Sequence, residues 1–148
     1  MSLIRHSLLI CVALSATQTF AQNRFTFAAL GDTPYYAFEE VRLEKLFADI
    51  NGEPLAFVVH IGDIKSARDP CDDKLYRKRK ALFDTIRHPF LITPGDNDWT
   101  DCWGRYGPAN GGYDPEERLE FERKTFFSTN QSLGAHTMTV ERESSEPA

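Results

Sequence analysis

The sequence lacks the short motifs by which several large enzyme classes are recognised. It contains no G-x-G-x-x-G fingerprint, no G-x-x-x-x-G-K-[ST] loop and no G-x-S-x-G elbow. These absences argue against the usual dinucleotide, nucleoside-triphosphate and serine-hydrolase sites. The haloacid-dehalogenase pattern needs an acid two residues after Asp32, where Pro34 stands. Without internal repeats or low-complexity tracts, the 148 residues are expected to form one domain at most.

The N-terminal segment lacks the length of a membrane span. The apolar run SLLICVALSA follows Arg5 and His6 and ends shortly before small residues around Ala21. This pattern predicts a secretory signal peptide over residues 1–21, with a buried helix or an uncleaved anchor as the alternatives. Residues 22–148 would then be exported to the periplasm or the extracellular space.

Positive charge is also scarce. The whole chain carries 17 basic and 22 acidic side chains, a net charge of −5, and removal of residues 1–21 takes away Arg5 and no acid. The mature chain would therefore carry a net charge of −6. Such a balance argues against a surface for nucleic acid or for an anionic membrane.

Cysteine is rare, and its distribution fits an exported protein. Of three cysteines, Cys11 lies in the predicted signal peptide, which leaves Cys71 and Cys102. An even pair in an oxidising compartment predicts a disulfide, with two free buried thiols as the alternative.

Strand-like and helical patterns alternate along the remaining chain. We expect strands at residues 24–30, 55–61 and 90–93, and helices at residues 38–50, 72–86 and from Asp114 onward. The run LAFVVHI is apolar enough for a strand buried on both faces. Asp114, Pro115 and Glu117 are typical of a capped helix start. The order β-α-β-α-β-α predicts an α/β fold with a parallel sheet.

Each predicted strand stops at a Gly-Asp pair. These pairs place Asp32, Asp63 and Asp96 at the carboxyl edge of the sheet, where α/β proteins bind ligands. Gathered carboxylates repel one another unless protons or cations neutralise them. Divalent metal ions accept such oxygen ligands, and a pair of ions about 3.5–4 Å apart can activate water and hold a phosphate oxygen.

The segments GDTPYY, HIGDIKS and TPGDNDWTDC, in this order, resemble the calcineurin-like metallophosphoesterase superfamily, and most closely an exported bacterial branch. The resemblance covers about residues 24–128. It implies an αββα sandwich that holds two divalent ions, Mn, Fe or Zn. The superfamily also has downstream Gly-His and Gly-His-x-His motifs, which this sequence does not contain. We therefore expect an incomplete sandwich, with residues 22–148 as its N-terminal part.

The resemblance assigns a role to each aspartate. Asp32 would bind the first metal ion, Asp63 would bridge both ions, and Asp96 would bind the second ion in place of the usual asparagine. Asn97 stands where the superfamily has a catalytic histidine, and it can donate a hydrogen bond but no proton. Pro34 stands at a frequent histidine position. His136 matches no ligand motif and is expected at the surface. Asp98 would either support the metal ligands or cap the loop.

These features predict a hydrolase of small phosphate esters that uses direct attack by a metal-activated water. The departures at Pro34 and Asn97 and the missing histidine motifs keep an alternative open. In that alternative the protein is an exported, non-catalytic module that binds metal or phosphate.

Overall fold

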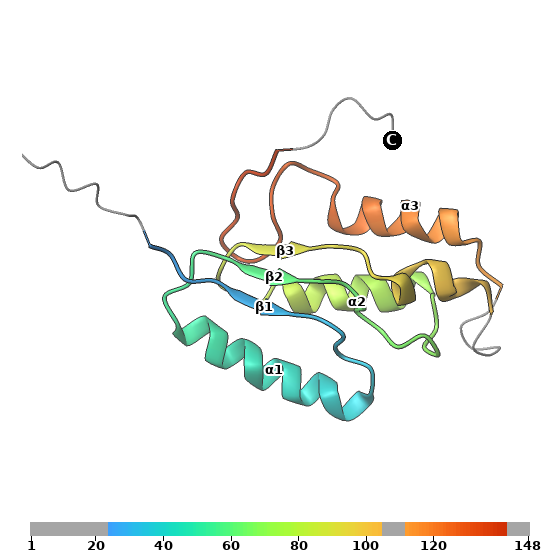
Figure 1. Ribbon diagram of the computed structural model, residues 1–148, viewed down its shortest axis with the longest axis horizontal. Helices are drawn as coiled ribbons and strands as arrows, with labels where there is room; N and C mark the ends of the chain where they lie inside the picture. Colours follow the sequence, from blue (N-terminus) through green and yellow to red (C-terminus); the bar gives the residue numbers. More distant parts are fainter. Residues whose placement is uncertain (1–23, 105–111, 142–148) are drawn as a thin grey trace, which may run out of the picture.

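Three parallel strands alternate with helices in the computed structural model, which describes residues 24–104 and 112–141. The strands β1 (Ala28–Leu30), β2 (Val58–His60) and β3 (Phe90–Ile92) form a single sheet in the order β1-β2-β3 (Figure 1). Ala28 pairs with Val58, which in turn pairs with Phe90. The predicted α/β fold with a β-α-β-α-β order is confirmed. The predicted signal peptide, residues 1–21, lies outside the described residues.

Two of the three helices begin at an aspartate that caps the first turn, as the sequence predicts for the helix after Asp114. Helix α1 spans Ala37–Gly52, α2 spans Asp73–Phe83 and α3 spans Pro115–Phe126. The carboxylate of Asp72 accepts the N–H of Leu75 at 2.8 Å, and that of Asp114 accepts the N–H of Glu117 at 3.0 Å. Each carboxylate satisfies a free N–H of a first helical turn. The reciprocal half of the expected capping box is absent from the α3 start, because the Glu117 carboxylate binds Arg118 instead.

Both crossover helices cover the same face of the sheet. The ring of Phe90 lies 6.1 Å from Phe47 of α1 and 4.7 Å from Phe83 of α2. Phe126 of α3 reaches the same cluster, 6.1 Å from Phe83. Right-handed crossovers between adjacent parallel strands produce this one-sided arrangement. The core therefore lies between the sheet and its helices.

The opposite face of the sheet is less covered by the described residues than the sequence suggested. A β2 region buried on both faces was predicted, yet Ile61 is 61% exposed while Val58 is fully buried. On α1, Leu43, Phe47 and Ile50 are buried, whereas the apolar residues Phe38, Val41 and Leu46 are exposed. Because α1 and α2 share one face of the sheet, the described part of the chain leaves Ile61 without a helix that covers it.

Two short 3-10 helices follow β3 and complete the carboxyl edge. They are η1 (Asp96–Asp98) and η2 (Thr100–Trp103). They contact each other, and each also contacts α3. Among the described residues, no helix has the length and hydrophobicity to span a membrane.

Candidate functional site

The turns after β2 and β3 pack so closely that only glycine fits at two positions. Gly62 has φ +93°, and a Cβ on it would lie 2.6 Å from the backbone nitrogen of Gly95. A Cβ on Gly95 would lie 2.1 Å from Oδ1 of Asp63. Asp32 and Asp63 themselves adopt left-handed conformations, with φ of 55° and 58°. Aspartate tolerates this region better than most residues, so the turns bring the carboxylates together with little backbone strain.

The carboxylates of Asp32 and Asp63 meet at one hydroxyl group. Oη of Tyr35 lies 2.9 Å from Oδ1 of Asp32 and 2.8 Å from Oδ2 of Asp63. A phenol has one proton and can donate it to only one of the two carboxylates at a time. One of the two carboxylates is therefore left at any time without the Tyr35 donor.

Asn97 connects Asp63 to the third aspartate. Its Nδ2 donates to Oδ2 of Asp63 at 2.9 Å. Its backbone N–H is shared between Oδ1 of Asp63, at 3.2 Å, and Oδ1 of Asp96, at 3.0 Å. Asp63 thus has one oxygen on the side of Asp32 and the other on the side of Asp96. Hydrogen bonds thus link the four residues named from the sequence, with Asp32 linked through the Tyr35 hydroxyl and Asp96 only through the Asn97 N–H.

The electrostatics of the cluster show an excess of negative charge. Partial burial raises the pKa of Asp63, and the nearby carboxylates of Asp96 and Asp32 raise it further. Hydrogen bonds from Tyr35 and from the Asn97 N–H oppose this rise in the pKa. Burial and the hydrogen bond to Asp63 raise the pKa of the Tyr35 phenol. A divalent cation between these oxygens would neutralise the repulsion.

Oxygen atoms of Asp32, Asp63 and Tyr35 meet in this cluster, and oxygen is the ligand type that hard divalent cations prefer. Over residues 24–104 and 112–141, no three or more His, Cys, Asp or Glu side chains are grouped so as to hold a metal ion. Oxygen donors suit Mn²⁺ better than Zn²⁺ among the ions that the resemblance implies.

The described histidines are engaged elsewhere. His60 is fully buried, and its Nε2 lies 3.0 Å from the carbonyl oxygen of Thr33. His88 likewise bonds the carbonyl oxygen of Ile50 at 3.1 Å, and His136 is exposed, as expected. Burial lowers the pKa of His60, so its ring stays neutral beside Phe83 and Phe90. These three side chains therefore fill structural or surface positions.

Asp98 holds together the two turns that follow β2 and β3. Its Oδ2 accepts the N–H groups of Asp63 and Gly95, and its Oδ1 accepts the N–H of Ile64, all at 2.9 Å. Burial raises the pKa of Asp98, while the three N–H donors oppose the shift. The two roles expected for Asp98 therefore coincide, since it caps the loop and supports Asp63. The sequence feature behind this expectation is the segment GDND, in which Asp98 follows Asp96 by two residues.

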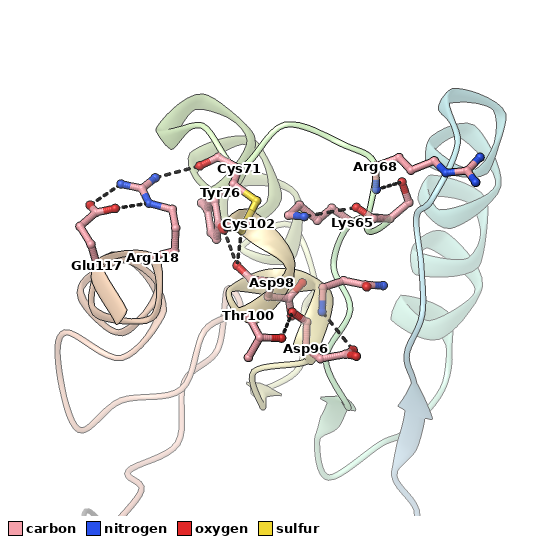
Figure 2. The surroundings of a disulfide bond; sticks show 12 residues. Lys65, Arg68, Cys71, Tyr76, Asp96, Asp98, Thr100, Cys102, Glu117 and Arg118 are labelled. Atoms are coloured by element: carbon pink, nitrogen blue, oxygen red, sulfur yellow. Dashed lines mark hydrogen bonds and ion pairs between the residues drawn. A yellow bond between two sulfur atoms is a disulfide. The ribbon is translucent and has the colours of Figure 1, made fainter. Parts of the chain in front are cut away.

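A buried polar layer lies behind Asp98. The predicted disulfide joins Cys71 to Cys102, both fully buried (Figure 2). Lys65 is also fully buried, and its Nζ donates to the carbonyl oxygen of Ser66 at 3.2 Å. Glu122 of α3 is fully buried, and its carboxylate oxygens have no hydrogen-bond partner among the described residues. This layer joins α3 to the loops of the site.

Comparisons with protein-family models, with curated proteins and with solved structures found no match to this chain. The superfamily resemblance therefore stays a prediction that rests on the residues quoted from the sequence.

Proposed function

We propose that this protein hydrolyses small phosphate esters with the help of two divalent metal ions bound at the carboxyl edge of the sheet. The observation that carries the proposal is the convergence of Asp32 and Asp63 on a single hydroxyl hydrogen of Tyr35. Asp63 also accepts hydrogen bonds from Asn97, but these donors are neutral and leave the negative charge of the two carboxylates uncompensated. Such a site favours a cation over water alone.

The position of Asp63 supports a bridging role. Its two oxygens face in different directions, one toward Asp32 through the Tyr35 hydroxyl and one toward Asp96 through the Asn97 N–H. In this proposal Asp32 and Asp63 hold one ion, and Asp63 and Asp96 hold the other. The identity of the ions is proposed as Mn, with Fe or Zn as the alternatives that the resemblance implies.

The residues of the chain position the reaction rather than form a covalent intermediate. Bound divalent ions would supply a nucleophilic water and stabilise charge on the phosphate oxygens. Nδ2 of Asn97 donates to Oδ2 of Asp63 and to Oη of Tyr35, and in the proposal one of these two donors turns to a phosphate oxygen. The Tyr35 hydroxyl is an ordinary phenol, which keeps its proton at neutral pH and therefore can donate a hydrogen bond.

The test is metal content and hydrolysis in the same preparations. We expect the chain, purified without chelator, to contain two Mn²⁺ ions by elemental analysis and to hydrolyse a generic phosphate ester. Asp63→Asn keeps a side chain that tolerates a left-handed backbone but removes the bridging charge, so both properties should be lost. Asp49→Asn, an exposed change on α1, is the matched control and should alter neither. Unchanged metal content in Asp63→Asn would disprove the bridging role.

The second candidate is a non-catalytic module that binds metal or phosphate. It is favoured by Asn97, which cannot transfer a proton, and by the engagement of His60 and His88 with backbone carbonyls. Metal content that depends on Asp63, without hydrolysis of any ester, would support this candidate.

We also infer that the protein is exported. The disulfide between Cys71 and Cys102 suits an oxidising compartment, and the N-terminal sequence is typical of a signal peptide. Mass spectrometry of the chain recovered from a secreting host should show cleavage after Ala21. An uncleaved N-terminus on cytoplasmic protein would contradict export.

A further inference from the structure

An open cleft lies directly beside the carboxylate cluster. Its volume is about 450 Å³, within the range of small-molecule sites. Tyr35 and Asn97 line it, and both side chains hydrogen-bond to Asp63 of the carboxylate cluster. The remaining wall comes from Tyr36 and from the loop after β2, which carries Ser66 and Arg68. A substrate whose phosphate reaches the cluster would place its other half in this cleft.

Arg68 gives the cleft a positive charge on a fixed loop. The loop is held by hydrogen bonds from the Ser66 N–H to Oδ2 of Asp69 and from the Asp69 N–H to the carbonyl oxygen of Ser66, both 3.1 Å. The Arg68 N–H also donates to Oγ of Ser66 at 3.3 Å. Arg68 is exposed, and none of the ion pairs among the described residues includes it. Figure 2 shows its side chain extended away from Lys65 and the disulfide.

Asp69 does not cancel this charge at the cleft. Its Oδ2 accepts the N–H of Ser66, which directs that oxygen into the loop. The guanidinium of Arg68 has no such intramolecular acceptor in the part of the chain that the structure describes. An exposed guanidinium at the rim of a cleft can bind a phosphate oxygen by a charge-assisted hydrogen bond.

The other wall of the cleft is the end of an aromatic stack. The rings of Tyr36 and Phe38 lie 5.5 Å apart and nearly parallel, with an interplanar angle of 6°. The guanidinium of Arg42 lies 5.0 Å from the centre of the Phe38 ring. Tyr36 is 61% exposed and lines the cleft, so it can accept a further planar group on its ring. Stacked rings are stabilised beyond their simple burial, which favours an aromatic occupant over an aliphatic one.

We propose that this cleft binds phosphate esters of planar aromatic groups, with the ester phosphate between Arg68 and the carboxylate cluster and the aromatic group stacked on Tyr36. This inference rests on the proposed function and names the substrate class of the same site. It also explains why two large aromatic side chains are exposed at the start of α1, beside the site.

Binding of inert phosphonates tests the cleft without any hydrolysis. Calorimetric titration of the Mn²⁺-loaded chain would compare phenylphosphonate, butylphosphonate and inorganic phosphate. We expect phenylphosphonate to bind about 3- to 10-fold more tightly than butylphosphonate, from stacking on Tyr36. Tyr36→Leu should remove this preference and leave the affinity for inorganic phosphate unchanged. Arg68→Gln should weaken all three ligands by about 10-fold, from the loss of one charge-assisted hydrogen bond.

Matched controls are available on other surfaces of the molecule. Phe25→Leu removes an exposed ring that packs at a tilted angle against Phe27 and Phe57, and Arg123→Gln removes an exposed guanidinium on α3. Neither control should change the three affinities. Equal affinities for the two phosphonates, no binding of any ligand, or equal effects of Tyr36→Leu and Phe25→Leu would overturn the cleft assignment. Hydrolysis of phenyl phosphate, measured separately at high concentration, decides the proposed function independently of that result.

Discussion

The backbone N–H of Asp63 donates to Oδ2 of Asp98 at 2.9 Å. This bond fixes the residue proposed to bridge two metal ions to a carboxylate that is itself fully buried. The same Oδ2 accepts the N–H of Gly95, so the turns after β2 and β3 meet at a single atom. The position of the candidate site thus depends on a side chain that lies behind it.

Asp98→Asn should destabilise the fold and weaken metal binding together. An asparagine offers one acceptor oxygen where Asp98 uses two, so at least one of the three N–H donors would face an amide N–H₂. A buried N–H without a partner costs about 1–3 kcal/mol, and the urea unfolding midpoint should fall accordingly. The exposed Asp49→Asn change on α1 should leave the midpoint in place. A stable Asp98→Asn variant that still binds metal would show that Asp63 is positioned without this carboxylate.

Gly95→Ala should abolish the site by steric overlap alone. Gly95 has φ of −102°, which alanine accepts, but its Cβ would lie 2.1 Å from Oδ1 and 2.3 Å from the nitrogen of Asp63. The turn must move, and Asp63 must move with it, so we expect metal binding to be lost and stability to fall. Gly52→Ala is the control at the end of α1, where no atom lies within 4 Å of the added Cβ. It should stabilise the protein by about 0.5–1 kcal/mol. Elemental analysis and urea unfolding of both variants would reveal whether the two glycines differ.

The architecture was readable from the sequence because its signals are local. Apolar runs that stop at Gly-Asp mark the strand ends, and Asp72 and Asp114 mark helix starts that the structure confirms. Each strand is shorter than its apolar run. Only three residues of each run pair with the neighbouring strand, beginning at Ala28, Val58 and Phe90. The exposure of Ile61 was not readable, since the burial of a sheet face depends on which helices cover it.

The side-chain contacts within the site were harder to predict from the sequence. Topology predicts Asp32, Asp63 and Asp96 at one edge of the sheet. In the structure Asp32 and Asp63 share the Tyr35 hydroxyl, whereas Asp96 is linked to Asp63 only through the Asn97 N–H. The contribution of Tyr35 depends on a hydroxyl that reaches back across the turn to both carboxylates, which no spacing rule indicates. The exposure of Arg68 and Tyr36 in one cleft likewise depends on two loops that are about 30 residues apart in the sequence.

Loss of the disulfide should cost a large part of the stability. Cys71 and Cys102 are separated by 31 positions, and closure of a loop of this length in the unfolded chain corresponds to about 3–4 kcal/mol in the chain-entropy model. The double variant Cys71→Ala/Cys102→Ala should therefore unfold at much lower urea. Reductant should lower the midpoint of the native protein and leave that of the double variant unchanged. Equal urea midpoints for the native protein and the double variant would mean that the disulfide does not stabilise the fold.

Glu122→Gln should change how stability depends on pH. Burial and the Asp98 carboxylate raise the pKa of Glu122, although Lys65 and Arg123 oppose the shift. The folded state therefore keeps a proton on Glu122 at pH values where the unfolded state has released it. By linkage, stability is highest below the ordinary pKa of a glutamate and falls as pH rises above it.

Glutamine cannot ionise, so Glu122→Gln should gain at least about 1 kcal/mol of stability relative to the native protein between pH 5 and pH 8, the equivalent of about one unit of pKa. Urea midpoints at pH 5, 6.5 and 8 would measure this gain, with Glu120→Gln on the exposed side of α3 as the control. Parallel pH profiles for the native protein and Glu122→Gln would show that the Glu122 carboxylate is ionised in the fold, held by Lys65.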